Sequence, residues 1–217
     1  MKKETKKNFG VAAILLGVFV LWTVAVRLVD VQPIGPQGSA VGFATINGWV
    51  HDLTGVHMAL YTVTDWLGLV PFGVAIGFAL LGLVQWMKRK HLRQVDFSIL
   101  VLGGFYLLVM AAYILFEVFV INYRPVLING YLEASYPSST TMLVLCVMPT
   151  AIMQLNTRIK NRTLKRWVGF GTTAFILFMV IGRLLSGVHW FTDIIGGALL
   201  SAGLVMLYHS ITSLEIK

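Results

Sequence analysis

The chain places an arginine, a histidine and an aspartate in one short stretch, Gly182-Arg183-Leu184-Leu185-Ser186-Gly187-Val188-His189-Trp190-Phe191-Thr192-Asp193, between two apolar segments. An arginine can bind phosphate through paired hydrogen bonds, and a histidine can attack phosphorus as a nucleophile. Asp193 follows His189 by four residues, so on a helix the carboxylate would lie beside the imidazole ring and could orient it. The stretch is therefore the first candidate for a functional site.

The composition is that of a membrane protein. Of the 217 residues, 57% are hydrophobic and 12% are charged, whereas a soluble domain is about 25% charged. The mean hydropathy is +0.81. We therefore expect an all-α, polytopic membrane protein with six transmembrane helices in one bundle, which forms a single domain over residues 1–217. The six apolar segments are Phe9–Val29, Val63–Met87, Ser98–Ile121, Thr141–Leu155, Val168–Leu185 and Asp193–Ile211.

The segment between the first two spans, Asp30–Thr62, has a mixed character. Gly35-Pro36-Gln37-Gly38 predicts a turn, and Ala44–Tyr61 predicts one or two short interfacial helices. The first apolar stretch is as long as a span and has no clear small-residue cleavage site, so we expect no cleavable signal peptide. The single cysteine, Cys146, excludes a disulfide within the chain and a CxxC metal site.

The basic residues predict the orientation in the membrane. The formal net charge of +8 is concentrated in short runs beside apolar segments, which favours topology signals over nucleic-acid binding. The three main runs are Lys2, Lys3, Lys6 and Lys7; Lys88, Arg89, Lys90 and Arg93; and Arg158, Lys160, Arg162, Lys165 and Arg166. The positive-inside rule then puts both termini in the cytoplasm and the segments around Arg124, Pro137 and His189 at the outer face.

Two of these outer segments add polar groups. Asn122-Tyr123-Arg124-Pro125 ends the third span, and Arg124 either binds a ligand or reaches lipid headgroups. Tyr136-Pro137-Ser138-Ser139-Thr140-Thr141 precedes the fourth span. It predicts a helix N-terminus, which either binds an anion through free N–H groups or is only a cap. For His189 and Asp193 the alternative is an interfacial histidine beside a helix-starting aspartate.

Together the three segments resemble the type 2 phosphatidic acid phosphatase family, which includes bacterial undecaprenyl-diphosphatases and vanadium haloperoxidases. The family motifs are KxxxxxxRP, PSGH and SRxxxxxHxxxD, and the matching part of this chain lies within residues 117–193. Arg124-Pro125 and Pro137-Ser138 match parts of the first two motifs. Arg183, His189 and Asp193 match the third, with Gly182 in place of its serine. The loop Asp30–Pro36 resembles members from Gram-positive bacteria.

The resemblance implies hydrolysis of a lipid phosphate or diphosphate, such as undecaprenyl diphosphate, at the outer face of a bacterial cytoplasmic membrane. His189 would attack phosphorus and form a phosphohistidine, while Asp193 would hold its tautomer. Arg124 and Arg183 would bind the phosphate oxygens.

Ser138 and the backbone near Ser139 would add hydrogen-bond donors. No cofactor or metal is implied, because two arginines supply the positive charge that magnesium supplies elsewhere. The expected partners are the lipid substrate and the surrounding membrane lipids, and no oligomeric state is predicted.

Two residues depart from the family pattern. Glu117 stands where the first motif has its lysine, and a carboxylate there repels phosphate. Thr140 stands where the second motif has its histidine, and losing a general acid costs about 10²–10⁴-fold in rate. A phosphate-type leaving group has a second pKa of about 6, so lipid diphosphate hydrolysis should suffer less than ester hydrolysis. His51 and His57 are the remaining histidines on the outer side.

These departures leave a second hypothesis, a catalytically inactive member, natural or engineered, that binds or carries a lipid phosphate. A third hypothesis is an unrelated channel or transporter. It has less support, because no span interior apart from Glu117 carries the Asp, Glu or Lys residues expected of an ion relay.

Overall fold

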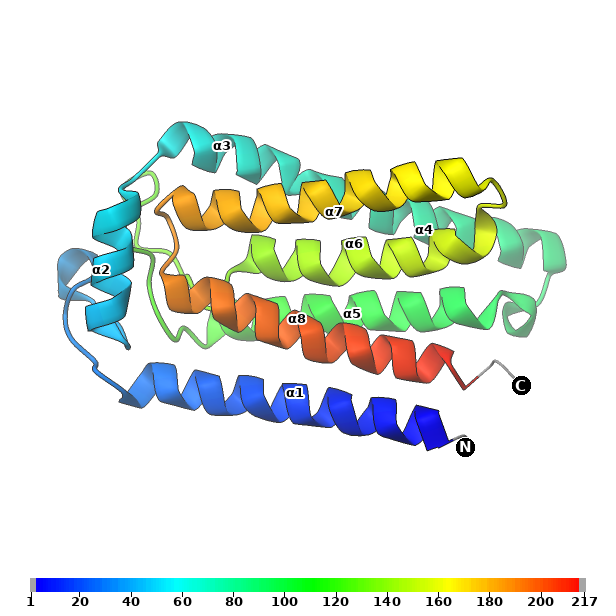
Figure 1. The fold of residues 1–217 in the computed structure, drawn as a ribbon, viewed down its shortest axis with the longest axis horizontal. Coiled ribbons are helices and arrows are strands. Elements are labelled where there is room, and N and C mark those ends of the chain that lie inside the picture. Colours follow the sequence, from blue (N-terminus) through cyan, green and yellow to red (C-terminus); the bar gives the residue numbers. More distant parts are fainter. Residues whose placement is uncertain (1–2, 215–217) are drawn as a thin grey trace.

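Six long helices run side by side in the computed structural model, which describes residues 3–214 (Figure 1). The expected fold class is therefore confirmed, and each of these helices is long and apolar enough to cross a membrane. They are α1 (Lys3–Leu28), α3 with α4 (Met58–Leu67 and Leu69–Arg89), α5 (Phe97–Val118), α6 (Ser139–Arg158), α7 (Arg162–Leu185) and α8 (Phe191–Thr212). Lys2, one of the N-terminal lysines counted above, lies outside the described residues.

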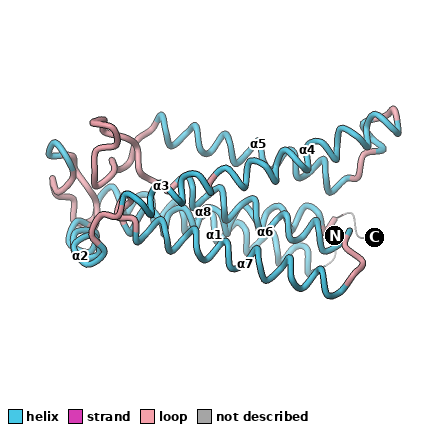
Figure 2. The backbone as a smooth tube through the Cα atoms, turned by 90° about the horizontal axis from the view of Figure 1, so that it is seen from above, coloured by secondary structure: helices cyan, strands magenta, loops and turns pink. Residues whose placement is uncertain are grey.

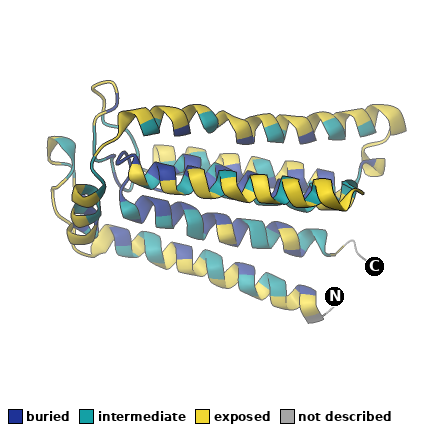
Figure 3. Ribbon diagram, turned by 45° about the horizontal axis from the view of Figure 1, so that its top comes forward, coloured by how far each residue is buried: buried dark blue, intermediate teal, exposed yellow. Residues whose placement is uncertain are grey.

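The centre of the bundle is formed by α6 and α8. In the most apolar stretch of each helix, 56% of the residues of α6 and 50% of those of α8 are buried. The corresponding share is 11–22% in the other spans (Figure 3). Apolar side chains gain little by leaving lipid for protein, so membrane helices associate through close packing. A Cβ atom at Gly203 of α8 would lie 2.7 Å from Leu16 of α1, which shows how closely these two helices approach.

The segment between the first two spans differs in part from the prediction. A 3₁₀ turn (Pro36–Gly38) and α2 (Ala44–Thr54) occupy the expected turn and interfacial helix. The second predicted helix is not separate from the membrane span, because α3 continues almost directly into α4. Gly68, at the junction, keeps a right-handed helical conformation with φ −59° and ψ −17°. The second span therefore starts at Met58 rather than Val63.

All three motif-bearing segments lie at one end of the bundle. There α2 lies across the helix ends, and both chain termini lie at the opposite end (Figures 1 and 2). The turn between α7 and α8, which carries His189, packs against the connection between α2 and α3. The N–H of His57 donates to the carbonyl of Ser186 at 3.0 Å. Gly187 has φ +68°, and a Cβ there would lie 1.9 Å from the carbonyl oxygen of Gly55.

This close packing makes Gly187→Ala a test of the fold around the site. Alanine would be strained at the positive φ and would collide with backbone, so we expect a loss of more than about 1 kcal/mol of stability. Thermal unfolding of the purified chain in detergent would show it as a lower Tm. Gly171→Ala is the control, because a Cβ there meets nothing within 4 Å. Equal Tm values for the two variants would contradict this packing.

Candidate functional site

His189 and Asp193 are joined through a third side chain. His189 is 3% exposed and Asp193 is fully buried. The Nδ1 atom of His189 lies 3.0 Å from the hydroxyl of Ser135, which donates to Oδ2 of Asp193. The direct distance from Nδ1 to Oδ2 is 3.9 Å. The sequence led us to expect a direct contact between ring and carboxylate, and instead the serine hydroxyl lies between them.

This arrangement fixes which ring nitrogen carries the proton. Nη2 of Arg183 lies 3.5 Å from Nε2 of His189, and a guanidinium has donors only, so Nε2 must be the unprotonated acceptor. Nδ1 then carries the hydrogen and donates to Ser135, whose own hydroxyl hydrogen goes to Asp193. The ring thus presents a free lone pair on Nε2, as a nucleophile requires.

Asp193 is held by groups from three segments. Besides Ser135, it accepts hydrogen bonds from the N–H of Trp190 at 2.9 Å and from the side-chain amide of Asn122 at 3.2 Å. The sequence analysis did not predict that Ser135 and Asn122 belong to the site. The one sequence signal for Ser135 is a polar residue just before the Pro-Ser pair, and that does not distinguish it from a surface serine.

Two guanidinium groups converge on the same place. Arg183 is 1% exposed, and its Nη1 lies 3.4 Å from the hydroxyl of Thr64 and 3.6 Å from a carboxylate oxygen of Asp65. The ring of Tyr61 lies 4.9 Å from the guanidinium carbon of Arg183 and 5.8 Å from that of Arg124. Residues of α3 therefore help to hold both arginines. The sequence analysis placed Tyr61 in an interfacial helix, and Thr64 and Asp65 at the start of the second span.

Donors in this group remain without partners among the described residues. They are Nη1 of Arg124, Nε of Arg183 and the hydroxyl of Ser138, all buried. A buried donor left unpaired costs about 1–3 kcal/mol. An oxyanion with several acceptor oxygens could pair with such donors, so the site has the chemistry to bind phosphate.

The start of α6 is fixed against the start of α8. Ser138 precedes α6 as its N-cap residue, and its N–H donates to the carbonyl of Asp193 at 3.0 Å. Ser139 begins the helix, whose first N–H groups have no partner within it. Thr140 is buried in the first turn at 8% exposure. The structure thus brings the Pro-Ser segment to the same end as the arginines, as the alternation of basic runs along the chain predicted.

The two other histidines on this side have different surroundings. The ring of His51, on α2, lies 5.5 Å from the ring of Trp190, the residue after His189. The ring of His57 hydrogen-bonds to the carbonyl of Thr54 at 2.9 Å. His51 therefore packs on the segment that carries the site, whereas His57 contacts the last residue of α2.

The electrostatic environment keeps His189 neutral. Burial, followed by the positive charges of Arg124 and Arg183, holds the pKa of His189 well below its ordinary value of 6.5. A neutral imidazole is the form that can act as a nucleophile, so the arginines that could bind a phosphate also preserve the reactivity of the ring.

Comparison with known proteins assigns the same family to this end of the chain. Residues 73–217 match the family model described as the PAP2 superfamily. No curated protein is similar enough to match. Among solved structures, the chain is similar to the first transmembrane PAP2 type phosphatidylglycerolphosphate phosphatase from Bacillus subtilis, with a TM-score of 0.57 and 18% identity over 94% of this chain and 96% of that chain. At this identity the likeness shows the fold alone.

The hydrogen-bond chain through Ser135 predicts the effect of Ser135→Ala. The variant removes the acceptor of the Nδ1 hydrogen and leaves only the contact with Arg183 to favour this tautomer, so the fraction of His189 protonated on Nε2 should rise. Nitrogen-15 NMR of ring-labelled histidine would detect this, with the His189 signals assigned by their loss in His189→Gln. Ser201→Ala is the matched control, because Ser201 is a buried serine whose hydroxyl donates to the carbonyls of Gly197 and Met142. An unchanged tautomer in Ser135→Ala would contradict the bridging role.

Proposed function

This chain belongs to the PAP2 superfamily, and on that premise we propose that it hydrolyses a lipid phosphate or diphosphate in the membrane. The observation that carries the proposal is that two buried arginines, Arg124 and Arg183, share the ring of Tyr61, and that Arg183 also contacts Nε2 of His189 at 3.5 Å. Unpaired donors on both arginines support a phosphate as the ligand.

In the proposed reaction, Nε2 of His189 attacks phosphorus and forms a phosphohistidine. The bond from phosphorus to the leaving oxygen breaks, and that oxygen takes the electron pair. Arg124 and Arg183 bind the phosphoryl oxygens, on which negative charge develops. Ser138 and the backbone near Ser139 add donors, and water then hydrolyses the phosphohistidine.

Thr140 bears on which substrate the site can process. An alkoxide leaving group needs a proton from a general acid, which threonine does not supply. A phosphate leaving group has a second pKa of about 6 and departs more easily without one. We therefore include a lipid diphosphate of the undecaprenyl type among the proposed substrates.

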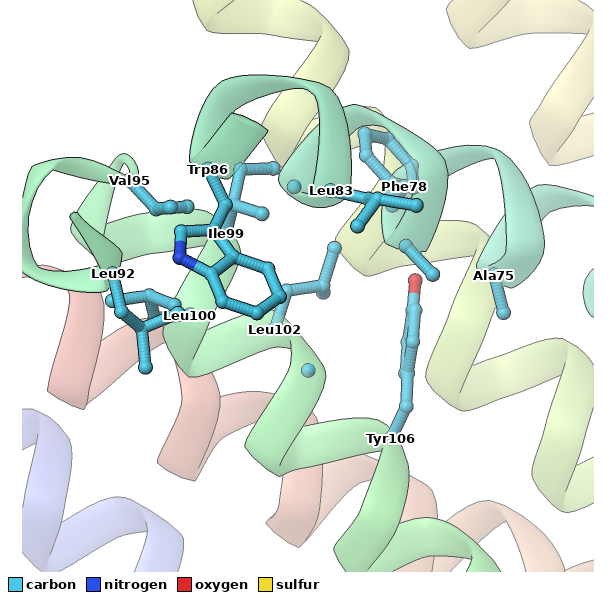
Figure 4. Close-up of a pocket in the computed structure, with 13 residues that line it drawn as sticks. Ala75, Phe78, Leu83, Trp86, Leu92, Val95, Ile99, Leu100, Leu102 and Tyr106 are labelled. Atoms are coloured by element: carbon cyan, nitrogen blue, oxygen red, sulfur yellow. The ribbon is translucent and has the colours of Figure 1, made fainter. Parts of the chain in front are cut away.

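An apolar groove between α4 and α5 would accommodate the lipid tail. A cavity of about 320 Å³ lies between α4 and α5, lined mainly by hydrocarbon side chains such as Phe78, Trp86 and Leu102 (Figure 4). A smaller one shares Ala75 and Tyr106 with it and extends to Pro71, near the start of α4. The groove thus runs towards the end at which the arginines lie. Because the basic runs lie at the opposite end, we propose that the site faces the outside of a bacterial cytoplasmic membrane.

A lipid-phosphate binder without turnover is the second candidate, and Thr140 is the observation that favours it. The carboxylates of Glu133 and Asp65 also lie 3.2 and 3.6 Å from the nitrogens of Arg124 and Arg183. A phosphate must compete with them for both arginines.

Phosphate release separates the two candidates. We expect the purified chain in detergent to release phosphate from a lipid diphosphate, and His189→Ala to reduce the release to background. Thr140→His restores a general acid and should raise the rate by about 10²–10⁴-fold, more for a lipid monophosphate than for a diphosphate. No release from either lipid at high protein concentration would leave the binder as the function.

The low pKa of His189 predicts the pH dependence of kcat/KM, which reports the free enzyme. Protonation of the ring removes the nucleophile, so activity falls as pH decreases through the pKa of His189. Because that pKa is held well below 6.5, the fall should occur well below pH 6.5. Arg124→Gln removes one positive charge, which makes protonation easier and should move the fall to higher pH. A profile centred at pH 6.5 in the unmodified chain would contradict this environment.

A further inference from the structure

A cavity beside the arginines contains two carboxylates as well as one guanidinium. It has a volume of about 320 Å³ and is lined by Glu117 and Glu133 together with Arg124. Ser135 and Ser139 also line it. The cavity wall therefore carries two negative side chains and one positive side chain. Such a balance is unusual for a site that binds only an anionic phosphate.

The cavity adjoins the reacting ring. Ser135 belongs to its wall, and the hydroxyl of the same residue lies 3.0 Å from Nδ1 of His189. Ser139, another wall residue, begins α6. If the two arginines bind the phosphate of a lipid, the part of the headgroup next to that phosphate would therefore lie in this cavity.

Arg124 indicates that the cavity holds an anionic group. It is about nine-tenths buried, and its Nη1 has no hydrogen-bond partner within residues 3–214. A carboxylate oxygen of Glu133 lies 3.2 Å from Nε, on one side of the Arg124 guanidinium group. The free Nη1 edge remains for an oxygen of a phosphate.

Glu117 and the aromatic residues indicate a cationic group in the same cavity. Glu117 is exposed and forms no ion pair with any described residue, although Arg124 lines the same cavity. Three aromatic residues, Tyr113, Phe116 and Tyr136, complete the wall. Carboxylates attract an ammonium group by charge, and aromatic faces attract it through their quadrupoles.

We propose that this cavity binds the ammonium group of an amine-bearing lipid phosphate, with Glu117 and Glu133 as its anionic partners. The inference rests on the proposed function, because it takes Arg124 and Arg183 as the phosphate-binding pair. The substrate class is then a lipid phosphate with an ammonium group a few bonds from phosphorus. The carboxylate at position 117 acts as a selector of headgroup in the place where the related motif has a lysine.

The test compares two probes that differ at the amine, which is charged in one and acylated and neutral in the other. Sphingosine 1-phosphate carries an ammonium near its phosphate, and its N-acetyl derivative has the same phosphate without the charge. Binding to the full chain in detergent is measured in the His189→Ala background, so that neither probe is consumed. We expect the amine probe to bind at least about tenfold more tightly, as loss of a hydrogen bond to a charged group would give.

Glu117→Gln and Glu133→Gln should each reduce this preference, and the double variant should bring the two affinities to within about twofold. Asp52→Asn is the control, because Asp52 is an exposed carboxylate on α2 that does not line the cavity. It should leave the preference unchanged. Glu117→Gln alters an exposed side chain, so it keeps the test valid if Glu133→Gln fails to fold.

Two results would overturn the inference. One is equal or tighter binding of the N-acetyl probe, and the other is a gain in affinity for both probes in Glu117→Gln, which would mean that the carboxylate only repels phosphate. Phosphate release by the unmodified chain is measured separately. If the chain releases phosphate but binds the two probes equally, this inference is wrong and the proposed hydrolysis stands. If it prefers the amine probe but releases no phosphate, the proposed hydrolysis is wrong and this inference stands.

Discussion

The buried carboxylate of Asp193 is the group on which the site end of the bundle depends. A charged or strongly polar group without water must be hydrogen-bonded, or it costs several kcal/mol. Asp193 meets this requirement with donors from Asn122, Ser135 and Trp190, and its carbonyl accepts from Ser138. The carboxylate and the backbone carbonyl of this one residue therefore hold the loop after α5, the start of α6 and the start of α8 against each other.

The second constraint is the burial of two arginines close together. Like charges repel, and burial strengthens the repulsion, so the pair needs compensation. The ring of Tyr61 faces both guanidinium groups, and Asp65 and Glu133 approach one each. Much of this compensation comes from α3. Thr64, the buried polar residue of α3, adds a contact to Nη1 of Arg183 at 3.4 Å.

The two departures from the family pattern lie in different parts of this arrangement. Thr140 lies in the first turn of α6 and removes a proton donor without disturbing the arginines or His189. Glu117 lies in the neighbouring cavity with Glu133 and three aromatic residues. In the reaction we propose, the first change limits which leaving groups suit the chemistry. In the headgroup site we propose, the second changes which headgroups suit the cavity, so both proposals concern the choice of substrate more than the nucleophile.

The six spans and the placement of Arg124, Arg183 and His189 at one end were determined by the sequence itself. Apolar length and the bias of basic residues are local properties, and a bilayer converts them directly into topology. Only the tertiary structure decided that Ser135 lies between His189 and Asp193 and that α3 holds the arginines. Those contacts join residues more than fifty positions apart. They depend on helix packing to within an ångström, which no local pattern encodes.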